Sequence, residues 1–393
     1  ENRKDQTFTF RELNEAVASV QKGLEKLGVK KGTRIAAFVP NCVETVILML
    51  AATSSGAIWT SCSPDFGSQG VIDRFGQIEP SILIVANGYT YNGKIFALED
   101  KINGVLETIN SIENVISINF VDIACSLNHN SVVNYDTLFL EEAKIPDFVQ
   151  LPFDHPLYIM YSSGTTGPPK SIIHGAGGTL IQHLKEHQLQ CDIQEGRDTL
   201  FWFTTCGWMM WNWLISALAS GATIVLYDGS PSHPDLGALW RTVEKTGITH
   251  FGTSPKFLAA CSNSGLEPKK EADLSSVKAL LSTGAPLVPE QFDWVYENIG
   301  SDIHLASISG GTDILGCFLG GSPILPVHRG EIQCPQLGMN VQSWNTDGKS
   351  IIGESGELVC VRPFPSMPIG FWNDSDGLKY KSAYFEEFPN IWT

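Results

Sequence analysis

The chain has 393 residues, of which 43% are hydrophobic and 17% charged, so it is long enough for two or three structural units that each bury a core. Its net charge of −16 argues against nucleic-acid binding, which normally needs a basic face, but ATP is still possible because backbone N–H groups, a lysine and a metal can bind phosphate locally. The chain starts with charged residues, and no apolar run reaches the ~18 residues that a membrane span needs. We therefore expect no signal peptide and no membrane contact.

Strands and helices alternate through the first part of the chain. Thr9 and Glu12 have the spacing of a capping box, and apolar residues then recur at helical spacing until Gly28. The next expected elements are strands at residues 34–39, 57–60 and 81–86 and helices at residues 43–54 and 69–78. Alternation at this spacing predicts βαβ units around a mostly parallel sheet.

The pattern pauses over residues 111–148, where we expect a connector with one or two strands, and then restarts. The expected strands are residues 157–162, 171–174, 200–204, 223–227, 277–281, 302–306 and 356–361. The expected helices are residues 178–190, 236–245, 255–261 and 289–298, with a buried helix rich in Trp and Met between the strands at 200–204 and 223–227. After Gly320 clear helices disappear, which indicates a small β-rich subdomain.

These elements predict three subdomains. Residues 1–150 form a first α/β subdomain, residues 151–319 a second one that contains a glycine-rich loop, and residues 320–393 the β-rich subdomain, truncated at its end. The nine cysteines are scattered, odd in number and without a CxxC motif, so we expect free thiols, a reducing cytosolic compartment and no zinc site. The sequence carries no indication of an oligomeric state.

The loop between the strands at 157–162 and 171–174 is the most informative segment. Glycine lets a backbone approach phosphate closely, hydroxyl and N–H groups donate to its oxygens, and Lys170 adds a positive charge. Pro169 rather than glycine precedes Lys170, and β-like residues follow it, so the loop is not a Walker A motif. The alternative is a plain polar turn. The expected phosphate-binding residues are Ser162, Ser163, Gly164, Thr165, Thr166, Gly167 and Lys170.

This loop resembles the phosphate loop of the adenylate-forming superfamily, which includes acyl-CoA synthetases, luciferases and peptide-synthetase adenylation domains. The resemblance covers nearly the whole chain, because further segments follow in the family's order and spacing. It implies an α/β fold: the large N-terminal domain of that superfamily, with two mostly parallel sheets, flanking helices and a small β-rich subdomain. It also implies ATP and Mg²⁺, with coenzyme A as co-substrate.

The resemblance assigns nucleotide contacts to segments beyond the loop. One segment matches the part of the family that lies against adenine, and a second matches the threonine that contacts the α-phosphate. The residues concerned are Gly284, Ala285, Pro286, Gly311 and Thr312. Thr165, Lys170 and Thr312 are the implied catalytic residues, since the first step needs placement and charge neutralisation more than proton transfer. Asp313 is the implied Mg²⁺ ligand, and it stands where the family has a longer Glu.

The segments at residues 206–211 and 307–313 are most similar to the acetoacetyl-CoA synthetase branch of the superfamily. Trp208 matches an aromatic residue that borders the acyl pocket, with a core tryptophan as the alternative. Met209 and Met210 are assigned to the same pocket. Gly310 stands where acetate-activating relatives have a tryptophan, so its small size implies room for a longer acid; the alternative is a glycine that only serves the backbone.

The implied reaction converts ATP, acetoacetate and coenzyme A to AMP, pyrophosphate and acetoacetyl-CoA through an acyl-adenylate. Another short or medium acid, or transfer to a carrier protein, is an open alternative. A third reading is a truncated product that binds nucleotide without turnover. The family pattern continues past Thr393 to a Gly-Asp that grips ribose and to a C-terminal domain with a catalytic lysine, so we expect that domain to be absent and the chain alone to have little or no adenylation activity.

Two other residues receive no site assignment. Lys256 either pairs with a polar end of the acyl group or, as is usual for a lysine at a helix start, is solvated. His174 lies in the strand after the loop without any metal-ligand spacing, so we interpret it as structural.

Overall fold

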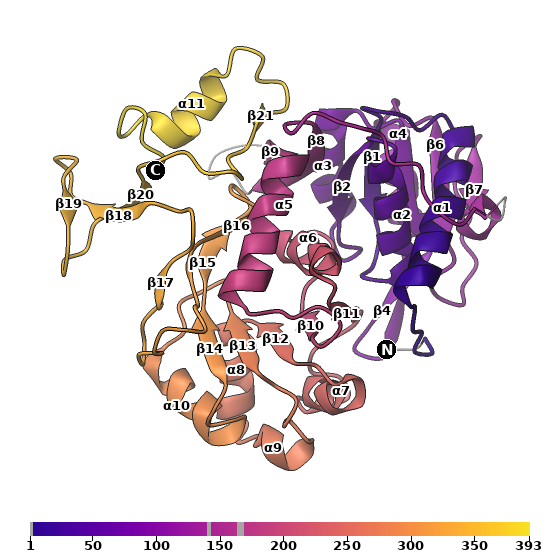
Figure 1. Cartoon of the computed structure of the whole chain (residues 1–393). Helices are drawn as coiled ribbons and strands as arrows, with labels where there is room; N and C mark the ends of the chain where they lie inside the picture. The colour runs from indigo at the N-terminus through magenta and orange to yellow at the C-terminus, as the bar shows by residue number, and fades with distance from the viewer. Residues whose placement is uncertain (1–2, 140–142, 163–168) are drawn as a thin grey trace. The chain divides into compact units, whose positions relative to one another are not determined.

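The computed structural model describes residues 3–139, 143–162 and 169–393. The chain divides into two α/β units and passes between them more than once (Figure 1). The first unit consists of Glu1–Ala176, Thr204–Trp211 and Leu226–Pro234, and the second of Gly177–Phe203, Asn212–Val225 and Asp235–Thr393. The expected α/β class, with two mostly parallel sheets, is confirmed.

The sheet of the first unit has the strand order β9-β8-β2-β1-β3-β6-β7 and is parallel except for the antiparallel pair β8–β9. Its strands are β1 (Arg34–Phe38), β2 (Ile58–Cys62), β3 (Ile82–Ala86), β6 (Asn114–Ile118), β7 (Val132–Asn134), β8 (Pro156–Ser162) and β9 (Lys170–Gly175). The helices are α1 (Phe10–Lys26), α2 (Val43–Ser54), α3 (Ser68–Ile78), α4 (Glu99–Thr108) and the 3₁₀ turn η1 (Tyr135–Leu138).

Local signals explain the first two helices. The Glu12 N–H donates to Thr9 Oγ1 (3.2 Å) and the Thr9 N–H donates to the Glu12 carboxylate (2.8 Å), so the capping box is confirmed at the start of α1. Helix α2 has the predicted bounds. It is apolar nearly all round because it packs beside α1 (Figure 1) and is largely buried.

One hairpin of the first unit was missed by the sequence analysis. Strands β4 (Gly88–Tyr91) and β5 (Lys94–Ala97) pair antiparallel across Asn92 and Gly93. Both turn residues have positive φ, 50° and 70°, which is the conformation that the Asn-Gly pair favours in two-residue hairpins. The dipeptide was therefore a usable signal.

The main sheet of the second unit is parallel throughout and has the order β11-β10-β12-β13-β14. Its strands are β10 (Thr199–Trp202), β11 (Thr223–Val225), β12 (His250–Thr253), β13 (Ala279–Ser282) and β14 (His304–Ser307). The helical segments are α5 (Ala176–Lys185), the π-turn η2 (Glu186–Gln190), α6 (Met209–Ser216), η3 (Ala217–Ser220), α7 (Ala238–Thr246), α8 (Pro255–Asn263), α9 (Pro268–Glu271) and α10 (Pro289–Asn298). Helix α6 is the expected helix rich in Trp and Met.

The last part of the second unit is β-rich, as expected, but it also contains a helix. Two small antiparallel sheets have the orders β15-β16-β17 and β19-β18-β20. The elements are β15 (Ser309–Gly311), β16 (Gly316–Gly320), β17 (Cys334–Pro335), β18 (Val341–Trp344), β19 (Ser350–Ile351), β20 (Glu357–Cys360), β21 (Gly370–Phe371) and α11 (Leu378–Phe385).

The expectation that clear helices end at Gly320 is therefore wrong. Helix α11 has weak amphipathic patterning, and Gly377 precedes it instead of a Ser or Thr cap. Its N-terminal N–H groups are satisfied from outside the helix, because the Asp374 carboxylate accepts from Lys379 (3.0 Å) and Tyr380 (2.8 Å).

The predicted boundary between residues 150 and 151 separates strands that belong to one sheet. Strand β8 pairs with β2 through Tyr158 and Trp59, so the hairpin β8–β9 joins the first unit. A long connector precedes β8, and nothing in the strand itself indicates which earlier strand it pairs with.

Candidate functional site

The antiparallel hairpin β8–β9 carries the loop that the sequence assigns to phosphate. Ser162 and Lys170 are paired residues at the loop ends of the two strands. Gln77 of α3 holds the second strand: its Nε2 donates to the Pro169 carbonyl (2.9 Å) and its Oε1 accepts from the Ser171 hydroxyl (3.1 Å). The two expected strands on either side of this segment are confirmed. Ser163, Gly164, Thr165, Thr166 and Gly167 lie outside the described residues.

The segment around Trp208 also belongs to the first unit. The Ser61 hydroxyl, in β2, donates to the Cys206 carbonyl (2.7 Å) and so fixes the start of this segment. Trp208 is 65% exposed, which excludes the core alternative and leaves the indole available to a ligand. Met209 and Met210 follow at the start of α6 and are buried.

In the second unit, the segments assigned to adenine and to the α-phosphate leave the same edge of the sheet. Strands β13 and β14 are adjacent and parallel, so the chain leaves both at their carboxyl ends, where open α/β sheets bind ligands. The Thr283 hydroxyl donates to the Ile308 carbonyl (2.9 Å) and ties the two exits together. Gly284 has φ +94°, which favours glycine, and Gly284, Ala285 and Pro286 are exposed.

Thr312 and Asp313 lie in a tight turn between β15 and β16. The Leu315 N–H donates to the Thr312 carbonyl (3.3 Å), and Leu315 itself has φ +48°, an uncommon conformation for a residue with a branched side chain. Thr312 and Asp313 are partly exposed, as ligand-contacting residues must be. Asp313 Oδ1 accepts a hydrogen bond of 2.6 Å from the hydroxyl of Tyr384, a residue that the sequence analysis did not single out.

Helix α5 holds this turn from behind. The buried His183 donates from Nε2 to the Leu315 carbonyl (2.6 Å), and its Nδ1 is hydrogen-bonded to the Ser216 hydroxyl (2.6 Å). Burial lowers the pKa of His183 to about 4 and so favours the neutral ring, which can donate from Nε2 to Leu315 and accept at Nδ1 from Ser216. This arrangement fixes the strained residue at the end of the Thr312–Asp313 turn.

A second contact from the same side comes from Glu186, the first residue of the π-turn η2. Its Oε1 accepts from Gln182 Nε2 (2.6 Å) and from the Cys317 N–H (2.9 Å), and its Oε2 accepts from Trp213 Nε1 (2.8 Å). Glu186 is 2% exposed, and burial raises the pKa of its carboxyl. The π-turn aims this carboxylate at the start of β16, directly after the candidate turn.

Acid is expected to destabilise the protein through His183. Burial lowers the pKa of His183 to about 4. Between pH ~6.5 and ~4, this imidazole is therefore protonated in the unfolded chain and neutral in the folded chain. The free energy of unfolding should fall by up to about 3 kcal/mol over this window as the pH drops. Denaturant titrations from pH 7 to pH 4 measure it.

The matched variant is His183→Gln, which keeps an N–H donor for the Leu315 carbonyl but does not titrate. Its loss of stability over the same pH window should be smaller, although not zero, because burial also lowers the pKa of His187 and His250. Equal pH dependence in parent and variant would show that His183 does not contribute.

Gly310 is required by the backbone. A Cβ at this position would lie 2.1 Å from the Gly316 carbonyl oxygen and 2.5 Å from Cys317 Cα, both on the paired strand β16. These are backbone atoms that a rotamer change cannot move. The observation favours the alternative that the glycine serves the backbone; enlargement of the acyl pocket stays a prediction.

Gly310→Ala should lower the free energy of unfolding by about 1–3 kcal/mol, because the added methyl overpacks β16. Gly311→Ala is the control: it lies on the same strand, and a Cβ there meets nothing within 4 Å. Thermal unfolding of the two variants compares them directly. If Gly310→Ala is as stable as Gly311→Ala, β16 can shift to accommodate a side chain at position 310. Gly310→Trp would then test acid selectivity without a loss of stability.

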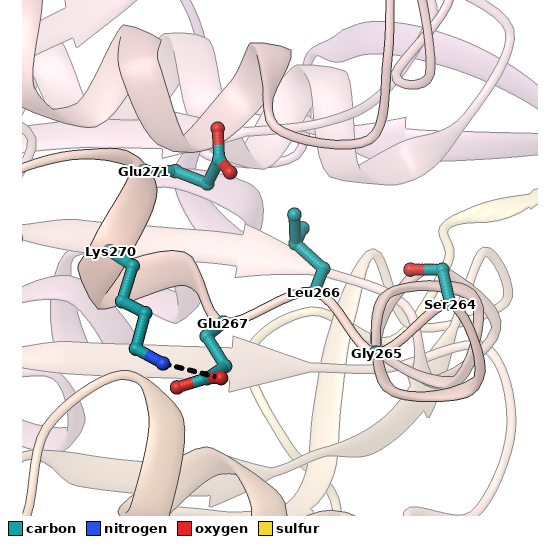
Figure 2. A pocket seen from close by; sticks show the side chains of 6 residues that line it. All are labelled: Ser264, Gly265, Leu266, Glu267, Lys270 and Glu271. Carbon is teal, nitrogen blue, oxygen red and sulfur yellow. Dashed lines mark hydrogen bonds and ion pairs between the residues drawn. The ribbon is translucent and has the colours of Figure 1, made fainter.

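The structure also shows where Lys256 and His174 lie. Lys256 is exposed at the start of α8, which favours the solvated interpretation. His174 is buried in β9. A surface pocket lies elsewhere, where α8 leads into α9; Figure 2 shows Lys270 paired with Glu267 (2.7 Å) at its wall. None of its lining residues was assigned a role by sequence, so we do not consider it the candidate site.

A metal at this site would depend on few protein ligands. Among the described residues, no group of three or more His, Cys, Asp or Glu side chains is placed to hold an ion. Asp313 offers a single carboxylate, which fits Mg²⁺ because this ion is usually held by one or two carboxylates together with substrate phosphates. Within residues 3–139, 143–162 and 169–393, no helix has both the length and the apolar character needed to cross a bilayer.

A family profile described as AMP-binding enzyme matches residues 2–368. The chain belongs to the AMP-binding enzyme family. The resemblance drawn from the loop and from the motifs that follow it is thereby confirmed at the level of the family. The chain spans about 60% of the length of the similar proteins described next.

Two similar sequences and one similar solved structure are named as acyl-CoA synthetases. The chain is 50% identical over 393 residues to an acetoacetyl-coenzyme A synthetase from Rhizobium meliloti (strain 1021), covering all of this chain and 60% of the relative. It is 42% identical over 416 residues to a malonamoyl-CoA synthetase from Penicillium aethiopicum, covering all of this chain and 56% of the relative. The solved acetoacetyl-CoA synthetase from Streptomyces lividans superposes with a TM-score of 0.95 at 44% identity, covering 99% of this chain and 60% of that one.

Proposed function

We propose that the protein to which this chain belongs activates acetoacetate with ATP and transfers it to coenzyme A. The observation that carries the proposal is 50% identity, over the full 393 residues, to a protein named acetoacetyl-coenzyme A synthetase. The acid attacks the α-phosphorus of ATP to give acetoacetyl-adenylate and pyrophosphate, and the thiol of coenzyme A then displaces AMP. Because the chain spans about 60% of that relative, the activity is proposed for the whole protein.

We propose contacts with ATP for three segments of the chain. Ser162 and Lys170, paired at the loop ends of β8 and β9, are proposed to contact the phosphates that leave as pyrophosphate, with Thr165 between them in the sequence. Gly284, Ala285 and Pro286 are proposed to lie against adenine; their exposure at the exit of β13 supports this assignment. Gly311 and Thr312 are proposed to contact the α-phosphate.

The chemistry of the first step is mainly charge neutralisation. A carboxylate is repelled by the triphosphate, so the Lys170 ammonium and the donors around the α-phosphate lower the barrier by stabilising the charge that builds up on phosphate oxygens. Asp313 would hold Mg²⁺, which when bound neutralises phosphate charge and orients the leaving group. The single carboxylate suits an ion held mainly by ATP.

The acid pocket is proposed to include Trp208, Met209, Met210 and Gly310. The 65% exposure of Trp208 supports this role. A relative named malonamoyl-CoA synthetase suggests an alternative substrate, since malonamate and acetoacetate both carry a carbonyl at the third carbon from the carboxyl end. We therefore propose an acid with a carbonyl at C3, with acetoacetate first and malonamate second.

Acid-dependent ATP–pyrophosphate exchange tests the proposal. The panel is acetoacetate, malonamate, butyrate and acetate, assayed with this chain and with a form extended by the C-terminal region of the Rhizobium meliloti relative. Acetoacetate should give the fastest exchange, and butyrate, which lacks the C3 carbonyl, a much slower one. Equal rates for acetoacetate and butyrate would refute the carbonyl requirement, and ATP binding without exchange in both forms would favour a non-catalytic nucleotide-binding protein.

We propose the cytosol as the compartment and a soluble small-molecule reaction without nucleic-acid or membrane partners. All nine cysteines are free thiols, and most are buried, which supports a reducing environment.

A further inference from the structure

The Thr312–Asp313 turn receives a hydrogen bond from a residue 71 positions further along the chain. The Tyr384 hydroxyl donates to Asp313 Oδ1 at 2.6 Å, a length typical of a bond to a charged carboxylate. The hydrogen bonds of the described residues engage only this one oxygen of Asp313. The bond thus constrains the rotation of the carboxylate while Oδ2 stays available to a ligand.

Tyr384 is itself rigidly held. Its ring stacks on Trp392 with a centroid separation of 3.9 Å and an interplanar angle of 14°. Phe371 packs against it edge-on at 5.5 Å, and the Thr393 N–H donates to the Tyr384 carbonyl (3.0 Å). The side chain is 4% exposed. A hydroxyl placed by so many contacts has little freedom to follow a moving partner, so it determines where the carboxylate points.

The stacked partner is anchored to a separate element. Trp392 accepts at its carbonyl from the Cys360 N–H (2.9 Å), at the end of β20, and its own N–H donates to the Cys360 carbonyl (3.3 Å). Tyr384 is therefore fixed between α11 and β20.

We propose that Tyr384 is a positioning residue for metal binding: its hydroxyl fixes the Asp313 carboxylate so that the second oxygen meets the divalent cation that accompanies ATP. This inference rests on the proposed function, because it takes Asp313 as the metal ligand. A hydrogen-bonded carboxylate loses less rotational freedom when it binds an ion, and removing such outer partners of metal ligands commonly weakens metal binding by about 10–100-fold. The effect should appear in metal binding and not in the binding of the nucleotide itself.

Isothermal titration calorimetry of ATP binding, with Mg²⁺ and with EDTA, tests the proposal on the full chain. The ratio of the two Kd values measures how strongly metal and nucleotide bind together. Tyr384→Phe keeps the ring and its stacking on Trp392 but removes the hydroxyl. It should reduce the ratio about tenfold through a weaker Kd in Mg²⁺, with the Kd in EDTA unchanged. Structural damage would instead raise both Kd values.

Two further variants calibrate the measurement. Tyr380→Phe removes a hydroxyl from the same aromatic cluster; the ring centroids of Tyr380 and Tyr384 are 5.1 Å apart. This variant should have the same ratio of Kd values as the parent. Asp313→Asn should abolish the advantage of Mg²⁺. A parent-like ratio in Tyr384→Phe, with Asp313→Asn impaired, would overturn this inference alone. No advantage of Mg²⁺ in the parent, or none lost in Asp313→Asn, would overturn the metal assignment of the proposed function and this inference with it.

Discussion

Lys170→Ala is expected to lower acetoacetate-dependent ATP–pyrophosphate exchange by about 10²–10³-fold, the usual cost of removing one group that stabilises transition-state charge. Lys170 begins β9 and pairs with Ser162 across the loop, so its backbone position is fixed by the hairpin and by Gln77. The variant should therefore fold normally and lose the charge alone. Exchange is measured in the extended form at saturating acetoacetate.

The conservative change and the control sharpen this prediction. Lys170→Arg keeps the charge but spreads it over a planar group, so we expect partial activity. Lys94→Ala removes an exposed lysine from β5 in the same unit and should leave exchange unchanged. Full exchange in Lys170→Ala would refute the phosphate role of this residue and weaken the assignment of the loop.

Glu186→Ala is expected to lower the free energy of unfolding by about 3–5 kcal/mol, which places it among the most damaging single changes. The change leaves three N–H donors, from Gln182, Cys317 and Trp213, without their acceptor in a buried place. It also isolates Lys185, whose ammonium lies 3.6 Å from the Glu186 carboxylate and is largely buried. Equilibrium denaturation at neutral pH measures the loss.

Glu186→Gln separates the loss of acceptors from the loss of charge. The amide oxygen replaces one carboxylate oxygen, but the NH₂ group must face one of the donors, so an intermediate loss is expected. Glu290→Ala, at a largely exposed glutamate of α10, should change stability by no more than about 0.5 kcal/mol. A loss in Glu186→Ala no larger than in Glu290→Ala would show that water replaces the carboxylate.

Sequence reasoning succeeded where the signal is local. Helix α2 was predicted at residues 43–54 after a strand that Pro40 ends, and the structure has these bounds, with Gly56 (φ +76°) just after the helix. The strands on either side of the glycine-rich segment at residues 163–168 were predicted because apolar runs meet glycine and proline there. Family motifs assigned nucleotide and metal contacts to Gly284, Thr312 and Asp313; these assignments stay predictions, and Gly284 has the positive φ that glycine favours.

It failed where a side chain acts on a distant part of the chain. Glu186 accepts from Cys317, 131 residues away, and no pattern around either residue indicates the contact. In the sequence Tyr384 is one aromatic residue among many; only the structure shows that its hydroxyl donates to Asp313. The crowding of Gly310 against β16 depends on strand pairing, which a sequence motif does not contain. Helix α11 was missed because its amphipathic patterning is weak and because Asp374, four residues before the helix, accepts from its first turn in place of a Ser or Thr at position 377.

The repeated passage of the chain between the two units bears on synthesis. The amide of Asn41, a buried residue of the first unit, accepts from Trp211 Nε1 (2.9 Å) and donates to the Tyr227 carbonyl (3.4 Å). Both partners lie in the two segments of the first unit that come latest in the sequence, Thr204–Trp211 and Leu226–Pro234. Although domains usually fold in order as they leave the ribosome, this unit cannot complete its core until Pro234 has emerged. A chaperone that holds nascent chains would therefore meet an unfinished first unit together with two early segments of the second, Gly177–Phe203 and Asn212–Val225, while Asp235–Thr393 is still to be made.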